Sequence, residues 1–259
     1  MTSPLGVMSV ILLEAAVGSA VVLWAGGVWG RVRRGFFLLI GSTIVLSAIG
    51  AWRLADGEFT AAPSPATDRA VLALAVFAGL ALAWQVLLFV HQGLSRAVGL
   101  AATAAGVVAL VLFGLARPHD PALAVLELAL GAVFLGATNY GLLLGHWYLV
   151  ERKLSKDPMV RSAWWYVAGV VAGVGTAALS AANPSPEAGG LSLYFSVPGF
   201  SVLLAGGLVA VCALISGFVV KLAKEGGRSI QAATGMFYLA VIMAFSAEMA
   251  AKVRYFATG

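Results

Sequence analysis

Three acidic side chains that could bind and release protons lie inside long apolar stretches of the chain: Glu14, Glu127 and Glu248. An ionisable residue in a membrane-spanning segment is a functional candidate by default, because placing its charge in hydrocarbon is costly. The functional interpretation is a carboxylate cluster that takes up protons or accepts them from a quinol. The structural interpretation is a ring of ion pairs at the outer membrane interface, where Lys252 and Arg254 could pair with the acids.

The depth of these acids follows from the polar residues at the far end of each apolar stretch. Glu14 precedes Arg31 by seventeen residues, and Glu127 precedes His146 by nineteen. At a helical rise of 1.5 Å per residue these separations span roughly 26 and 28 Å, close to the thickness of the hydrocarbon layer. We therefore expect the carboxylates to share one level near the outer boundary of the membrane.

Two histidines could ligate a haem iron on the opposite side. His91 and His146 each precede a basic segment, and imidazoles from two helices can hold one haem b axially. Gly141 and Gly145, beside His146, could admit a flat macrocycle. Since the chain has three histidines and a dihaem site needs four ligands, at most one bis-histidine haem is expected. The alternative is an aromatic interfacial belt around His146 and an ordinary helix end at His91.

Asn139 is a candidate of another kind, because an unpaired amide in hydrocarbon costs several kcal/mol. It lies two helical turns before His146, on nearly the same face. The functional interpretation is a polar pocket for a quinone carbonyl or a small solute that extends toward His146. The structural interpretation is an interhelical hydrogen bond, worth about 0.6 kcal/mol on average. The expected partners are polar residues near the middle of the bilayer: Gln85, Ser42, Thr43, Thr103 and Thr234.

The composition of the chain predicts that apolar helices position all these side chains. Of 259 residues, 61% are hydrophobic and 10% are charged, and the mean hydropathy is +0.97. A soluble domain carries about 25% charged residues. Because the apolar runs are continuous rather than alternating, we expect an all-α integral membrane protein rather than a β-barrel. Eight runs are long enough to span a bilayer. They cover residues 8–29, 35–52, 70–91, 97–116, 121–149, 163–182, 200–220 and 230–250.

The positive charges predict the orientation. With the N-terminus outside, eleven of the sixteen Lys and Arg residues fall in cytoplasmic loops, as the positive-inside rule requires. Both termini should therefore be extracytoplasmic, in a bacterial-type inner membrane. Two Pro- and Gly-containing outer loops are expected at residues 53–69 and 183–199. The first run lacks a preceding basic segment and should be retained as a helix rather than cleaved. The pI near 9.6 is explained by the basic loops and indicates no nucleic-acid binding.

Short internal similarities suggest a single membrane domain built from two parallel four-helix halves, residues 1–117 and 118–259, with no soluble domain. The segments LLEAAVGSA, from residue 12, and VLELALGAV, from residue 125, both place a glutamate four residues before a glycine. If the halves are repeats, the two glutamate-bearing helices should face each other across an axis along the membrane normal. Small residues at helical spacing should allow close packing: Gly26 with Gly30, Gly141 with Gly145, and Gly169 with Gly173.

These observations favour a non-catalytic subunit of a respiratory or other membrane complex, which binds quinone or one haem b and docks onto other membrane subunits. The alternatives are a proton-coupled carrier of a small solute and a scaffold subunit without a ligand. The sequence has no Gly-rich phosphate loop, no HExxH motif and no nucleophile with a local base, so no nucleotide and no hydrolytic chemistry is expected. No proline interrupts the middle of a predicted span, which weighs against a carrier with broken helices.

Overall fold

The computed structural model describes residues 4–59, 63–90, 92–117, 120–151, 153–182 and 199–252. All regular secondary structure in these ranges is helical, and each of the eight helices is long and apolar enough to span a membrane. The prediction of an all-α protein with eight membrane-spanning helices is therefore confirmed. The helices are α1 (Pro4–Ala25), α2 (Arg34–Phe59), α3 (Pro65–Val90), α4 (Gln92–Leu115), α5 (Pro121–Val150), α6 (Asp157–Ala182), α7 (Phe200–Glu225) and α8 (Ser229–Lys252).

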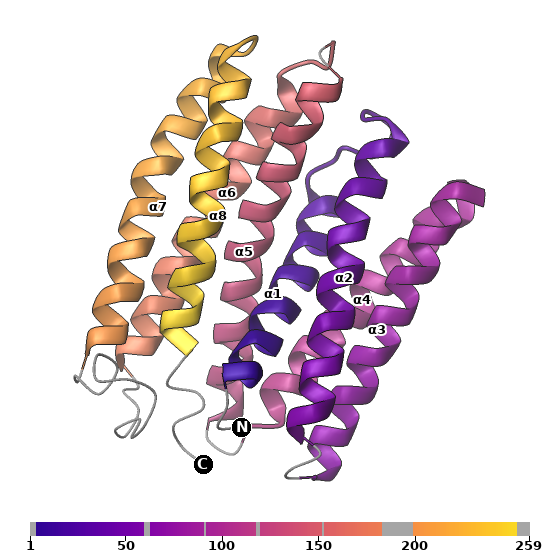
Figure 1. Cartoon of the computed structure of the whole chain (residues 1–259), viewed down its shortest axis with the longest axis vertical. Helices are drawn as coiled ribbons and strands as arrows, with labels where there is room; N and C mark the ends of the chain where they lie inside the picture. The colour runs from indigo at the N-terminus through magenta and orange to yellow at the C-terminus, as the bar shows by residue number, and fades with distance from the viewer. Residues whose placement is uncertain are drawn as a thin grey trace.

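The helices run up and down in chain order, with α1 and α5 side by side in the middle of the bundle (Figure 1). In this view α2, α3 and α4 lie on one side of the central pair, and α6, α7 and α8 lie on the other. We call the end where α1 begins and α8 ends the terminal end. We call the opposite end the basic end, because its loops carry Arg31, Arg33, Lys153, Lys156 and Arg228. The side of the membrane that each end faces stays a prediction.

Prolines and glycines set several helix boundaries. Helix α3 begins at Pro65 and α5 at Pro121, as expected for a residue whose missing N–H is not needed in the first turn. Helix α1 ends at Ala25, where Gly27 takes a left-handed φ of 63°. The helix therefore ends four residues before residue 29, the predicted end of the first apolar run. The predicted small-residue ridge of Gly26 and Gly30 on the first helix is therefore wrong, since both glycines lie in the α1–α2 loop.

The predicted outer loop at residues 53–69 is also largely wrong. Helix α2 continues to Phe59 and α3 already begins at Pro65, although these helix ends carry charged residues. The reason is that a helix does not stop where its sequence ceases to be apolar, since charged residues at its end can remain helical outside the hydrocarbon. Of the other predicted outer loop, residues 183–198 lie outside the described residues.

Two glycines, Gly18 and Gly136, lie where α1 crosses α5. A Cβ atom on Gly18 would overlap the carbonyl oxygen of Ala132, and one on Gly136 would overlap the backbone of Gly18. The backbones of the two helices are therefore in direct contact, as small residues allow in membrane proteins. The two glutamate-bearing helices do lie against each other, whereas the origin of the halves as repeats stays a prediction.

Large apolar side chains on the peripheral helices face outward from the bundle, where they suit contact with lipid acyl chains rather than with water. The most exposed of them include Leu72, Val86 and Phe89 of α3, Leu203, Leu214 and Phe218 of α7, and Ile242 of α8.

Candidate functional site

Four charged side chains from three helices gather inside the bundle, toward its terminal end. We call them the acid–lysine cluster: Glu14 of α1, Glu127 of α5, and Glu248 and Lys252 of α8. None has more than 1% of its surface exposed. The Lys252 Nζ lies 2.7 Å from Glu14 Oε1 and also donates a hydrogen bond to Glu248 Oε2. Glu127 interacts electrostatically with both Glu14 and Lys252. One buried ammonium therefore joins α8 to α1.

Helix geometry and one glycine position this cluster. Glu248 and Lys252 are four residues apart and so lie on one face of α8. Glu14 lies ten residues after Pro4, about 15 Å along the axis of α1. A Cβ atom on Gly131 of α5 would lie 2.5 Å from Glu14 Oε1 and 2.7 Å from Lys252 Nζ. The absence of a side chain at residue 131 thus provides the space that the ion pair occupies.

A threonine extends the cluster to α6. The buried Thr176 Oγ1 lies 2.9 Å from Glu248 Oε1 and 2.9 Å from the carbonyl oxygen of Gly173. A hydroxyl has one proton to donate, and a carbonyl can only accept. When Glu248 is ionised, Thr176 can donate to it. When Glu248 is protonated, it can donate to Thr176, which then donates to Gly173. The same heavy-atom positions therefore serve both protonation states of Glu248.

The charges around Lys252 do not balance when every group is ionised, because the two carboxylates that contact it, Glu14 and Glu248, face one ammonium. An uncompensated buried charge costs several kcal/mol. Glu14 Oε2 is buried and has no hydrogen-bond partner among the described residues. The ammonium of Lys252 lies between Glu14 and Glu248, and a proton on either carboxylate would remove the remaining negative charge.

The structure thus brings Glu14, Glu127 and Glu248 together, with Lys252 as predicted. It places them between helices, and Lys252 forms ion pairs with Glu14 and Glu248. Their depth relative to the outer membrane boundary stays a prediction, and Arg254 lies outside the described residues. Sequence reasoning missed Thr176 and Gly131. The glutamate-to-glycine spacing shared by the two halves was the only signal for Gly131.

Asn139 makes a different bond from those expected. Its Nδ2 donates to Ser19 Oγ of α1 over 2.9 Å, and Ser19 is fully buried. The five expected partners are therefore wrong. The reason is the backbone contact between Gly18 and Gly136. Ser19 follows Gly18 and Asn139 lies one turn after Gly136, so this contact places the two side chains beside each other.

The five expected partners of Asn139 bond elsewhere. Gln85 of α3 donates to the carbonyl oxygen of Leu38 over 2.9 Å and to Ser42 Oγ of α2 over 3.0 Å. The three threonines donate to carbonyl oxygens of their own helices: Thr43 to Ile40, Thr103 to Gly99 and Thr234 to Ile230. Gln85 and Asn139 consequently belong to two separate helix interfaces.

The bond between Asn139 and Ser19 predicts a small coupling. In a double-mutant cycle of Asn139→Leu and Ser19→Ala, we expect an interaction of about 0.6 kcal/mol in the free energy of unfolding, the average for such bonds in membranes. Chemical unfolding from mixed micelles, followed by tryptophan fluorescence, measures it. Asn139→Leu combined with Thr103→Ala is the control and should be additive. A coupling of zero for the first pair would contradict the assignment.

Of the two histidine candidates, the structure describes His146 alone. His146 is exposed, and its Nδ1 lies 3.3 Å from Tyr238 Oη of α8. It therefore bonds to α8, whereas Asn139 bonds to α1. A Cβ atom on Gly141 would overlap the ring of Phe237 of α8. The ring of Phe237 therefore occupies the space beside Gly141 where a macrocycle was expected, whereas a haem held by His91 and His146 stays a prediction. His91 lies outside the described residues.

Gly145 of α5, and Gly169 and Gly173 of α6, allow close packing between helices. A Cβ atom on Gly145 would lie 2.5 Å from Thr234 Oγ1 of α8. On α6, Cβ atoms on Gly169 and Gly173 would lie 3.0 Å from Ala137 Cβ and 2.8 Å from Phe134 Cδ1 of α5. These glycines therefore set the close approach of α5 to both α8 and α6.

The eight apolar helices and the apolar exterior define a multi-pass helical membrane protein. Comparison with protein-family models, with curated proteins and with solved structures gives no match, so the function is inferred from the chain's own residues.

Proposed function

We propose that the protein is a proton-coupled carrier of a small solute, and that the acid–lysine cluster is its proton-binding site. The observation that carries the proposal is the burial of two carboxylates, Glu14 and Glu248, against the one ammonium of Lys252. Such a cluster gains a proton at small structural cost, because Thr176 can pair with either form of Glu248. A scaffold subunit without a ligand does not need this excess of negative charge, because balanced ion pairs or apolar packing would stabilise it equally well.

The position of the cluster supports coupling between proton binding and movement. Glu14 belongs to the half formed by α1–α4, whereas the other three charged residues belong to α5–α8. In carriers built from two halves, coupling-ion sites lie between the halves, which move against each other. Protonation of Glu14 would weaken its attraction to Lys252. The proton would thereby bias the packing of α8 against α1.

Infrared difference spectroscopy of the protein in liposomes tests proton binding. As the pH is lowered, we expect growth of a carbonyl band from a protonated carboxylic acid, and loss of this band in Glu14→Gln or Glu248→Gln. Thr176→Val should shift the band, because it removes the hydrogen bond to Glu248. Glu225→Gln, at an exposed carboxylate of the basic end, is the matched control and should keep the band unchanged.

Proteoliposomes with an internal pH dye test the carrier part of the proposal. A panel of small neutral and anionic solutes is added outside, and at least one is expected to move protons in wild type but not in Glu14→Gln. An infrared band that persists in both glutamine variants would contradict the proton site. A band that disappears as expected, with no solute-dependent proton movement, would contradict the carrier and leave a proton-binding subunit.

A membrane subunit of a redox complex, with bound quinone and partner subunits, is the second candidate. The observation that favours it is an aromatic cluster toward the basic end, in which Trp24 lies 6.1 Å from Trp84 and Phe36 lies 6.0 Å from Tyr140, between ring centroids. The Trp84 Nε1 and the Tyr140 hydroxyl are buried without a hydrogen-bond partner among the described residues, and quinone carbonyls accept such bonds. Quinone recovered by solvent extraction of the purified protein would favour this candidate.

A further inference from the structure

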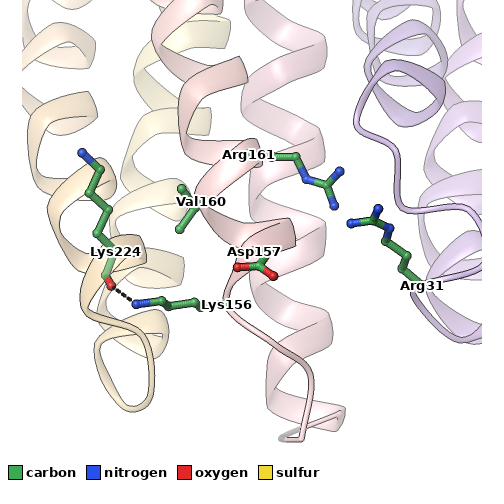
Figure 2. A pocket seen from close by; sticks show the side chains of 6 residues that line it. All are labelled: Arg31, Lys156, Asp157, Val160, Arg161 and Lys224. Atoms are coloured by element: carbon green, nitrogen blue, oxygen red, sulfur yellow. Dashed lines mark hydrogen bonds between the residues drawn. The ribbon is translucent and has the colours of Figure 1, made fainter.

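A pocket of about 540 Å³ opens at the basic end of the bundle (Figure 2). Its walls come from the α1–α2 loop, the start of α6 and the end of α7. Four of the six lining residues are basic and one is acidic. They are Arg31, Lys156, Asp157, Val160, Arg161 and Lys224. The pocket therefore attracts anions.

Two arginines of this pocket, the exposed Arg31 and the half-buried Arg161, have no carboxylate partner among the described residues. Figure 2 shows the guanidinium groups of Arg31 and Arg161 pointing toward each other from the α1–α2 loop and from α6. Neither forms an ion pair within 4.0 Å with a carboxylate of the described residues, although Asp157 lines the same pocket. The Nε and Nη2 of Arg161 are buried without a hydrogen-bond partner in that part of the chain. An oxyanion between the guanidinium groups would bond both and remove their repulsion.

The surroundings hold Arg161 in place. Gly27, whose φ is 63°, brings the α1–α2 turn so close that a Cβ atom there would lie 3.0 Å from Arg161 Nη1. Lys156 Nζ donates to the carbonyl oxygen of Lys224 over 2.8 Å and so ties the start of α6 to the end of α7. The Lys224 Nζ lies 5.4 Å from the ring of Trp164 and is engaged there. The two guanidiniums are the basic groups of the pocket that point toward each other and are placed to bind one anion together.

We propose that Arg31 and Arg161 bind the phosphate group of an anionic ligand. Planar guanidinium groups match phosphate oxygens in paired hydrogen bonds, which a lysine cannot reproduce. The phosphate belongs either to the headgroup of an anionic phospholipid or to free phosphate in solution. Basic pockets between membrane helices bind anionic headgroups in this manner. The proposal does not depend on the proton site, since the two sites share no residue.

Thermal unfolding of the full chain in a neutral detergent tests the site. The midpoint is measured with increasing phosphatidylglycerol, phosphatidylcholine or inorganic phosphate, at constant ionic strength. We expect phosphatidylglycerol or inorganic phosphate to raise the midpoint of the wild type, and Arg31→Gln or Arg161→Gln to weaken the apparent affinity by about tenfold or more. Arg33→Gln is the control and should respond like the wild type, because Arg33 has 82% of its side chain exposed and pairs with Glu151 over 3.1 Å.

The outcomes separate the two sources of phosphate. A response to phosphatidylglycerol alone identifies a lipid headgroup, and a response to inorganic phosphate identifies free phosphate. Equal responses of wild type, Arg31→Gln and Arg161→Gln would overturn the proposal, as would equal stabilisation by phosphatidylcholine. If Arg161→Gln does not fold, Arg161→Lys replaces it in the same thermal-unfolding test. It keeps the charge but loses the paired geometry, so its affinity should still fall below that of the wild type.

Discussion

Lys252→Met is expected to lower the free energy of unfolding by about 3–5 kcal/mol, the cost of removing one partner of a buried ion pair. Lys252 is fully buried, and its ammonium is the cation that bonds both Glu14 and Glu248. Methionine has a similar length and no branch, so the variant removes the charge with little change in packing. Chemical unfolding from mixed micelles, followed by tryptophan fluorescence, measures the loss.

Two further variants identify the cause of this loss. Lys221→Met, at an exposed lysine of α7, should change the free energy of unfolding by less than about 0.5 kcal/mol. Lys252→Met combined with Glu14→Gln and Glu248→Gln should recover most of the loss, because it leaves fewer unpaired charges in the bundle. If Lys252→Met were as mild as Lys221→Met, the ammonium would not be neutralising the buried carboxylates.

Gly18→Ala is the second substitution with a large expected effect, a loss of about 3 kcal/mol in the free energy of unfolding. This lies at the upper end for overpacking, because the added methyl group overlaps the backbone carbonyl of Ala132, which cannot rotate away. Helices α1 and α5 would have to separate, which would also stretch the bond between Asn139 and Ser19. The same unfolding measurement applies.

Glycines elsewhere in the bundle provide the control for Gly18→Ala. Gly206 and Gly217 lie within α7, and a Cβ atom on either would meet no heavy atom within 4 Å. Alanine at these positions should be neutral or stabilising by about 0.5–1 kcal/mol, because glycine is entropically unfavourable in a helix. A loss for Gly18→Ala no greater than the change for Gly206→Ala would show that α1 and α5 are not in backbone contact.

The sequence by itself determined that the chain forms eight membrane-spanning helices. The length of an apolar run is a property of the chain alone, and a bilayer requires each run to satisfy its own backbone hydrogen bonds. The sequence determined the ends of the helices less well, as the continuation of α2 to Phe59 and the early end of α1 at Ala25 show. Charged residues can extend a helix beyond the hydrocarbon, and one left-handed glycine can end it.

Only the tertiary structure decided which faces of these helices meet. Lipid is as apolar as the interior of the bundle, so apolar periodicity does not separate buried faces from lipid-facing ones. Asn139 therefore had several equally plausible partners, and the close contact of Gly18 with Gly136 selected Ser19. Helix packing likewise enclosed the three glutamates around Lys252 and pointed Arg31 toward Arg161. Each of these arrangements depends on how closely two backbones can approach, which is decided jointly by residues far apart in the chain.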